Sequence, residues 1–430
     1  MPRNLVICCD GTNNRFGREN TSVVRLVQVL NRTPGRQRLY YDPGVGTLPE
    51  PGMWNATLRW LSKVGGLAFG TGLNRNVEEA YAYLMDHWEP GDHVFMFGFS
   101  RGAYTVRVLA ALLHTLGLLP RGGHNLVPYV MRLFASSRDK AGTDDNGAPG
   151  ARFLAYQRLC DEFRLTFARV VPGAADHEQR RFPVRFMGVW DTVASVGWVW
   201  DPVSFPHTAC NPSIGTIRHA IAIDERRAFF RQNRFRCPKD QPPHPDLVEA
   251  WFPGVHSDVG GGYPTTDGNL WRPAFDWMLA AAERAGLQVD EQRRLQIVPP
   301  LPPDAKPWAD RIHESLKGWW WAAEYFPKLP RQSAGGRRRS LWPGIGRGRR
   351  RFVQPGALLH RSALLRVREP SGNYAPTNLD ERFLAQVRAL SEVPDFLAYR
   401  PNGAGAGGPA SPLVDAADAP DVADKVAASR

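Results

Sequence analysis

Apolar and polar positions in the first 120 residues alternate in blocks that predict strands and helices in turn. Short apolar runs at 4–8, 38–41 and 93–99 are typical of buried strands. Between these runs, apolar residues recur at the spacing of a helix over 23–30 and again over 77–88. An alternation of this kind predicts an α/β fold with a mostly parallel sheet and helices on both faces.

Three later runs are also predicted as strands, at 183–189, 247–252 and 357–367. The first two are followed by turns of small and polar residues that contain Asp191 and His256. Open α/β sheets place their sites at the carboxyl ends of strands. Asp191 and His256 are therefore candidates for one shared site.

The motif Gly98-Phe99-Ser100-Arg101-Gly102 lies between the strand 93–99 and a helix expected to extend to about 119. A serine hydroxyl attacks a carbonyl only when it protrudes from the backbone and a base removes its proton. In a sharp turn between strand and helix the serine protrudes, and Gly98 and Gly102 remove Cβ atoms that would clash. The five residues alone also occur as a structural turn, but their context favours Ser100 as the nucleophile of a serine hydrolase.

A base and an orienting acid are expected after the nucleophile, in the order Ser, Asp, His. Asp191 and His256 fit that order, and a glycine-rich turn is an untypical place for a core histidine. Asp201 and Asp258 are competing acids, although Asp258 lies so close to His256 in sequence that it is better placed to shape the loop. A structural role for Asp191 or His256 is the alternative.

The loop Asp10-Gly11-Thr12 follows the first strand and is a candidate for part of an oxyanion hole. Backbone N–H groups of Gly11 or Thr12 would act with that of Arg101, at the start of the helix. The loop also resembles the D-x-D-G-T pattern of aspartyl phosphohydrolases, but Cys8 stands where the nucleophilic aspartate is required. A structural turn is the other interpretation.

The remaining segments predict one domain with additions. Residues 1–285 are expected to form the core, with an insertion near 121–181, and 286–400 to close the same domain. The closing region contains 319–351, where consecutive tryptophans precede an arginine-rich stretch. The tail 401–430 has too few large apolar residues to fold and is expected to be disordered.

The formal net charge of +12 is concentrated in 337–351, which contains seven arginines. Such a cluster suits nucleic acid or acidic lipid headgroups, or is a solvated loop. No recognised nucleic-acid-binding motif accompanies it, which disfavours nucleic acid as a partner. With the tryptophans, the cluster is compatible with peripheral contact of 319–351 with an anionic membrane, but tryptophans that pack inward beside solvated arginines are the favoured interpretation.

The five cysteines are odd in number and lack C-x-x-C spacing. We therefore expect buried thiols and a reducing compartment rather than a disulfide framework or a zinc site. Neither a secretory signal nor a run of 18 apolar residues is evident, so a cytoplasmic location is the default expectation. Export without a cleaved signal is compatible with the sequence, and no pattern indicates an oligomeric state.

Four motifs occur in order along the chain: Cys9-Asp10-Gly11-Thr12-Asn13-Asn14, Gly98-Phe99-Ser100-Arg101-Gly102-Ala103, Gly188-Val189-Trp190-Asp191-Thr192-Val193 and Gly254-Val255-His256-Ser257-Asp258-Val259-Gly260-Gly261-Gly262-Tyr263. With them, roughly residues 3–380 resemble the α/β-hydrolase domain of type VI secretion phospholipase effectors, a family formerly catalogued as a domain of unknown function. The resemblance implies an α/β-hydrolase-like fold with helical insertions, a triad of Ser100, Asp191 and His256, and a lipid ester substrate.

Two further segments look like parts of the same family. Glu225 and Arg226 are expected either as a structural ion pair or as residues that line the site. His360 is a reserve candidate for the base of the triad.

The resulting hypothesis is a serine hydrolase that cleaves carboxylic esters, of phospholipids or other lipids, through an acyl-enzyme. This chemistry requires no metal and no cofactor. The alternatives are a short-chain carboxylesterase and a catalytically silent binding protein that uses the basic patch.

Overall fold

The computed structural model describes residues 2–11, 17, 20–33, 35–44, 67–137, 150–172, 180–193, 197–198, 201–202, 205–238, 241–318, 320–325, 347–369 and 373–401. The expectations for Thr12, Trp319, the arginines before residue 347 and the tail from 402 onward therefore fall outside the described residues.

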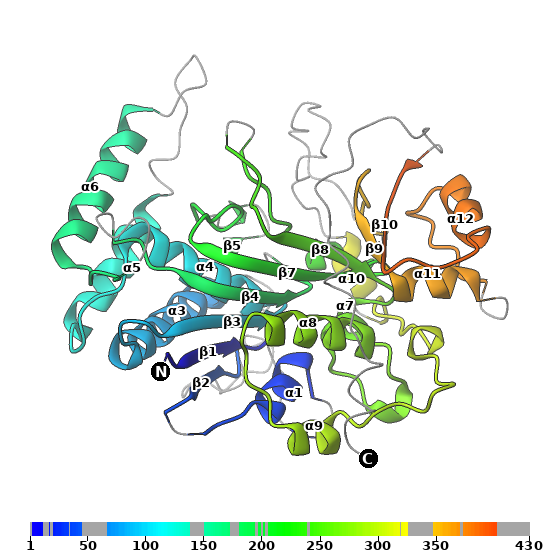
Figure 1. The fold of residues 1–430 in the computed structure, drawn as a ribbon. Coiled ribbons are helices and arrows are strands. Elements are labelled where there is room, and N and C mark those ends of the chain that lie inside the picture. The colour runs from blue at the N-terminus through cyan, green and yellow to red at the C-terminus, as the bar shows by residue number, and fades with distance from the viewer. Residues whose placement is uncertain are drawn as a thin grey trace, which may run out of the picture.

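An eight-stranded sheet crosses the described part of the molecule (Figure 1). Its spatial order is β10-β9-β8-β7-β4-β3-β1-β2, and all neighbours are parallel except β9 and β10. The strands of this sheet are β1 (Asn4–Cys9), β2 (Gln37–Asp42), β3 (His93–Phe99), β4 (Val184–Trp190), β7 (Ile214–Ala222), β8 (Leu247–Phe252), β9 (Leu358–His360) and β10 (Phe396–Ala398). A separate two-stranded sheet pairs β5 (Gly197–Trp198) with β6 (Asp201–Pro202).

Helices cover both faces of the large sheet, because successive strand residues point to opposite faces and most of them are apolar. Leu5 and Ile7 of β1 share a core with α3, α4, α5 and α6, whereas Val6 and Cys8 share a second core with α1 and α8. The helices are α1 (Ser22–Val29), α3 (Leu67–His87), α4 (Arg101–Leu116), α5 (Val127–Ala135), α6 (Ala151–Phe167), α7 (His256–Gly260), α8 (Arg272–Arg284), α9 (Glu291–Ile297), α10 (Trp320–Tyr325), α11 (Arg361–Arg368) and α12 (Glu381–Arg388). The predicted α/β fold with a mostly parallel sheet is confirmed.

The additions to this core lie at two opposite sides of the molecule in Figure 1. Helices α5 and α6 of the insertion lie on the side of α4, with α6 at the far left of the view. At the opposite end, β9 and β10 extend the sheet, and α11 and α12 pack around Trp251 and Leu359 in a third core. Strands from 358–360 and 396–398 are thus paired into the same sheet as β1.

The strands differ from the sequence-based expectation in two ways: β5, β6, β7 and β10 were not predicted, and β9 is shorter than expected. Strand β7 was not predicted, because Arg218 and His219 interrupt its apolar run; in the structure Arg218 pairs with Asp246, just before β8, and His219 with Glu249 of β8. The strand expected at 357–367 is wrong beyond His360. There the chain turns into α11, and the His360 side chain accepts the Ser362 backbone N–H as an N-cap.

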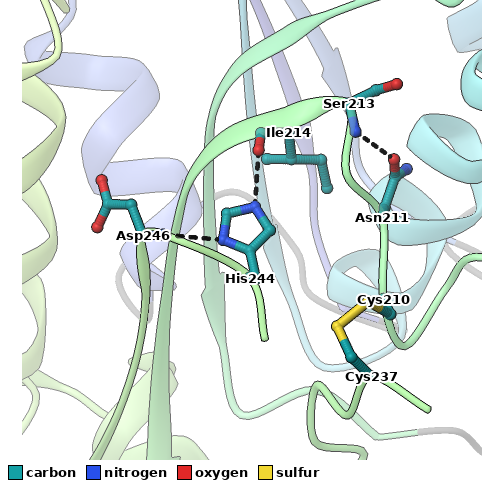
Figure 2. The surroundings of a disulfide bond; sticks show 7 residues. All are labelled: Cys210, Asn211, Ser213, Ile214, Cys237, His244 and Asp246. Atoms are coloured by element: carbon teal, nitrogen blue, oxygen red, sulfur yellow. Dashed lines mark hydrogen bonds between the residues drawn. A yellow bond between two sulfur atoms is a disulfide. The ribbon is translucent and has the colours of Figure 1, made fainter. Parts of the chain in front are cut away.

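The expectation for the cysteines is also wrong in part. Cys210 and Cys237 form a disulfide across 27 positions, although Cys8, Cys9 and Cys160 are buried free thiols as expected. Figure 2 shows this bond beside the start of β7, where His244 contacts the Ile214 carbonyl oxygen at 2.7 Å. An odd number of cysteines leaves room for one such pair. Because disulfides persist in oxidising compartments, the cysteines give no support to a reducing one.

Candidate active site

Ser100 occupies a strained turn between β3 and α4. Its φ of 59° is rare for a residue with a Cβ atom, and its side chain is buried. The turn has no room for larger flanking residues: a Cβ on Gly98 would lie 2.6 Å from the Ala103 Cα, and one on Gly102 would lie 2.1 Å from the Cys9 carbonyl oxygen. The turn therefore has the geometry of a nucleophile elbow.

The structure brings Ser100, Asp191 and His256 into one chain of hydrogen bonds. His256 Nε2 lies 2.8 Å from Ser100 Oγ, and His256 Nδ1 lies 2.5 Å from Asp191 Oδ2. The three residues directly follow β3 and β4 and, across a short turn, β8, whose carboxyl ends meet at one edge because these strands are parallel. With the proton of Nδ1 donated to Asp191, Nε2 accepts the Ser100 hydroxyl proton.

Asp191 is completely buried and has a left-handed φ of 40°. The Ala222 backbone N–H donates to its Oδ1 at 2.9 Å. Both carboxylate oxygens also accept from the guanidinium of Arg351, at 2.5 and 2.9 Å. The acid of the candidate triad is therefore held by three neighbours, one of which comes from the closing region.

From the sequence alone, Arg351 belongs to the basic patch as a solvated or membrane-facing residue, and for Arg351 that interpretation is wrong. Its side chain is buried, whereas Arg347 and Arg349 are exposed. No motif or spacing separates Arg351 from the arginines around it. Only the tertiary structure could reveal this contact with Asp191.

The surroundings of the triad keep His256 neutral and Asp191 charged. Burial lowers the pKa of His256, and the hydrogen bond to Asp191 partly offsets that effect. Burial also opposes the charge on Asp191, but Arg351 and His256 outweigh it and hold the pKa of Asp191 below its usual range. Phe99 stacks on the His256 ring at 4.6 Å, and Phe230 meets it edge-on at 4.8 Å. A neutral imidazole beside the serine hydroxyl is the form that a general base requires.

Glu225 contacts the His256 backbone, and its carboxylate does not form the expected ion pair with the Arg226 side chain. Its carboxylate accepts from the His256 backbone N–H at 3.2 Å and from the Arg227 guanidinium at 2.9 and 3.0 Å. The Arg226 guanidinium instead contacts Glu314, at 3.3 Å. Burial opposes the charge on Glu225, but Arg227 outweighs it and lowers the pKa of Glu225 to about 2. Glu225 thus supports the backbone of the loop that carries His256.

The three oxyanion candidates have different positions. Arg101 is the first residue of α4, so its backbone N–H lies beside Ser100 at the positive end of the helix dipole. The loop after β1 packs against the elbow, but the Gly11 N–H donates to Asp10 Oδ1 at 2.6 Å. Gly11 must turn away from that carboxylate before it can reach an oxyanion, and Thr12 is outside the described residues.

The competing candidates are engaged elsewhere. Asp258 accepts from His313 Nδ1 at 2.6 Å and from the Val255 backbone N–H at 2.9 Å, as expected for a residue that shapes the loop. His360 caps α11 and stacks on Phe252 at 4.4 Å. The side chain of Asp201 is outside the described residues.

Two further features are absent from the described residues. They contain no group of three or more His, Cys, Asp or Glu side chains arranged to hold a metal ion. Among their helices, none is both long enough and apolar enough to cross a bilayer.

A mostly parallel sheet with helices on both faces, and a serine on a sharp turn between strand and helix, define an α/β-hydrolase-like fold. Residues 3–281 match the model of the family described as "T6SS, Phospholipase effector Tle1-like, catalytic domain". The chain belongs to this family, as the resemblance of its motifs implied. The matched segment ends 70 positions before Arg351, since 351 − 281 = 70.

Individual relatives share 30% or less of their residues with this chain. "Uncharacterized protein YEL023C" of Saccharomyces cerevisiae (strain ATCC 204508 / S288c) is 30% identical over 272 residues, which are 62% of this chain and 37% of the relative. The chain thus spans little more than a third of that relative. The crystal structure of an uncharacterized protein from Pseudomonas aeruginosa has 18% identity and a TM-score of 0.41, covering 70% of this chain and 49% of that one. The structure of the Tle1 effector bound to the VgrG spike from the type 6 secretion system has 15% identity and a TM-score of 0.38, covering 70% and 76%.

Proposed function

We propose that this protein is a serine hydrolase that cleaves carboxylic ester bonds of phospholipids or other lipids. The observation that carries the proposal is the hydrogen-bonded chain from Ser100 through His256 to Asp191, at the carboxyl ends of parallel strands. Membership in a family of phospholipase effectors supports the lipid substrate.

In the proposed mechanism, His256 removes the proton of Ser100 as its oxygen attacks the ester carbonyl. Asp191 holds the imidazole in the correct tautomer and stabilises the imidazolium that forms. The N–H of Arg101, with that of Gly11 or Thr12, holds the tetrahedral oxyanion. His256 then protonates the leaving alcohol, and a water molecule activated by the same imidazole hydrolyses the acyl-enzyme and restores Ser100.

The test compares wild type with Ser100→Ala on p-nitrophenyl butyrate, p-nitrophenyl palmitate and a fluorogenic phospholipid. We expect Ser100→Ala to lose roughly a thousandfold or more in kcat, because the nucleophile is removed. Ser136→Ala is the matched control, since the Ser136 hydroxyl donates to the Leu133 carbonyl at the end of α5, outside the triad. Unchanged turnover by Ser100→Ala would refute the proposal.

The choice of substrates separates the alternatives. A preference for butyrate with no phospholipid cleavage would identify a short-chain carboxylesterase. A fluorophosphonate probe distinguishes an enzyme from a silent binding protein, because it labels only an activated serine. Labelling of wild type but not of Ser100→Ala is expected.

We also propose that the protein touches anionic membranes through the region 319–351. Within the described part of that region and beside it, Trp321, Tyr325 and Phe352 are 39%, 58% and 63% exposed. The turn at Gly348 lies against the Trp321 ring and carries the exposed Arg347 and Arg349. Exposed aromatic rings beside arginines suit the interface between headgroups and acyl chains.

Sedimentation with vesicles of phosphatidylcholine, with and without phosphatidylglycerol, tests this contact. We expect binding only to the anionic vesicles, weakened by Trp321→Ala. The control is Phe167→Ala, which removes a ring with 43% exposure from α6, a helix outside this surface. Equal binding by wild type and Trp321→Ala, or no binding to either vesicle, would contradict the proposal.

A further inference from the structure

Arg351 lies beyond the segment that matches the catalytic family, yet it makes the most extensive polar contact with Asp191. We propose that Arg351 is a positioning residue of the triad, which fixes the Asp191 carboxylate and thereby sets the basicity of His256. The inference deepens the proposed function of this site and rests on it.

All three nitrogens of the Arg351 guanidinium have acceptors in the site. Nη1 donates to Asp191 Oδ1 at 2.5 Å and to the Ala222 carbonyl at 3.2 Å. Nη2 donates to Asp191 Oδ2 at 2.9 Å and also to the Phe230 carbonyl. Nε donates to the same Phe230 carbonyl at 3.1 Å. This two-pronged contact with a carboxylate restricts rotation of Asp191 more strongly than a single hydrogen bond would.

The backbone of Arg351 is fixed as well. The Asn378 side-chain amide donates to the Arg351 carbonyl and to the Ile223 carbonyl, each at 3.0 Å. Val353 is only 2% exposed and packs in the same core as Ile223 and Trp251. Arg351 is therefore attached to the residue that follows β7, one position beyond Ala222. This attachment keeps the guanidinium within reach of Asp191.

The Asp191 carboxylate is saturated by these partners. Oδ1 accepts from the Ala222 N–H and Arg351, while Oδ2 accepts from His256 and Arg351. A buried carboxylate alone would strongly stabilise the protonated imidazole. The positive charge of Arg351 offsets that effect at close range and in a water-poor site.

Two other carboxylates face the loop that carries His256, and each has a partner. Glu225, from the segment after β7, accepts the His256 backbone N–H and is paired with Arg227. Asp258 of α7 is paired with His313 and also faces this loop. With both arginines in place, His256 faces two carboxylate–guanidinium pairs, so removing Arg351 leaves the charge of Asp191 uncompensated.

The consequence is a shift in pH dependence. Without the guanidinium, Asp191 stabilises the imidazolium more strongly, so the pKa of His256 rises. His256 then loses its proton only at higher pH. The acid limb of the kcat/KM profile, the range in which activity rises as His256 is deprotonated, therefore moves to higher pH. Neutralising one close charge in a buried site shifts this pH dependence by about one unit or more.

The experiment measures kcat/KM for p-nitrophenyl butyrate between about pH 5 and pH 9 on the full chain. We expect Arg351→Met to move the acid limb up by about one unit, with activity recovering toward the alkaline end. Arg351→Lys keeps the charge and loses the second prong, so its acid limb is expected near that of wild type despite a lower kcat. The control is Arg164→Met, which removes a buried arginine that contacts Asp161 and the Thr115 carbonyl, outside the triad.

An acid limb of Arg351→Met that coincides with that of wild type overturns the inference, because a merely structural arginine lowers kcat at every pH alike. If Arg351→Met does not fold, Asn378→Ala loosens the same contact. A shift of a few tenths of a pH unit in the same direction is then expected, and an unchanged limb overturns the inference.

A second readout needs no turnover. An NMR titration of the histidine rings, with His256→Gln to assign the signal, reports the pKa of His256 directly. The signal is expected to titrate at higher pH in Arg351→Met than in wild type. Absence of ester hydrolysis in wild type would refute the proposed function, whereas an identical titration in both proteins would refute the role of Arg351.

Discussion

The elbow at Ser100 depends on close approach between α4 and β1, and Gly102→Ala tests that dependence. The added Cβ would lie 2.1 Å from the Cys9 carbonyl oxygen and 2.5 Å from the Asp10 carbonyl oxygen. An ordinary carbon–oxygen contact is roughly 3.3 Å or more. The backbone of the elbow must therefore move by roughly 1 Å, because both colliding atoms belong to a buried strand end and cannot rotate away.

Two measurable losses follow from this displacement. A steric insertion into a well-packed site costs about 1–3 kcal/mol of unfolding free energy, occasionally more. A shift of about 1 Å in the nucleophile lowers kcat/KM by about a hundredfold, because the attack geometry is lost. We expect both losses in Gly102→Ala, measured by urea denaturation and by p-nitrophenyl butyrate hydrolysis.

Gly123→Ala is the matched control. Its added Cβ would lie 3.1 Å from the Pro120 carbonyl oxygen, which a displacement of a few tenths of an ångström relieves. Its unfolding free energy and kcat/KM are expected to remain close to those of wild type. If Gly102→Ala matches this control in both measurements, the close approach of α4 and β1 does not determine the position of Ser100.

Three further predictions concern other parts of the structure. Reducing the Cys210–Cys237 bond, or replacing Cys237 by Ser, is expected to lower the unfolding free energy by about 3 kcal/mol, because closure of the 27-position loop restricts the unfolded chain. Denaturation with and without a reductant measures this loss. Equal stability in both conditions would show that the bond contributes nothing. Burial lowers the pKa of His219 and of His256, so below about pH 6.5 the unfolded chain binds more protons than the folded one. The free energy of unfolding should therefore fall as the pH falls. Urea unfolding along a pH series measures this, and a free energy that stays constant or rises would contradict it. His360→Asn keeps an N-cap acceptor and should retain kcat/KM within roughly threefold, whereas His256→Gln should lose roughly a thousandfold, and a comparable loss in both would reopen the choice of base.

Local constraints made the elbow and the fold class predictable from the sequence. A Cβ at Gly98 would meet Gly102 and Ala103 of the same turn, so the five-residue motif already carries that constraint. A Cβ at Gly102 would instead meet Cys9 and Asp10 at the end of β1, a contact that only the folded chain creates. A parallel sheet also places the ends of successive strands at one edge, which is why Asp191 and His256 could be proposed from their positions after apolar runs. The family match over 3–281 agrees with the four motifs that lie in that segment.

Contacts between distant segments were decided only by the tertiary structure. Arg351 reaches Asp191 across 160 positions, and the disulfide joins two loops whose approach depends on β7. Strand β7 itself was not predicted, because its Arg218 and His219 gain partners only when Asp246, just before β8, and Glu249 of β8 lie beside them.

The physical reason is the range of each interaction. Steric and periodic constraints act between near neighbours in the chain, so a sequence displays them directly. An ion pair or a disulfide requires only that two side chains meet in space, and nothing in the residues around Arg351 records which carboxylate it will meet. The candidate nucleophile was therefore evident from the sequence, whereas the arginine that holds the candidate acid became visible only in the folded chain.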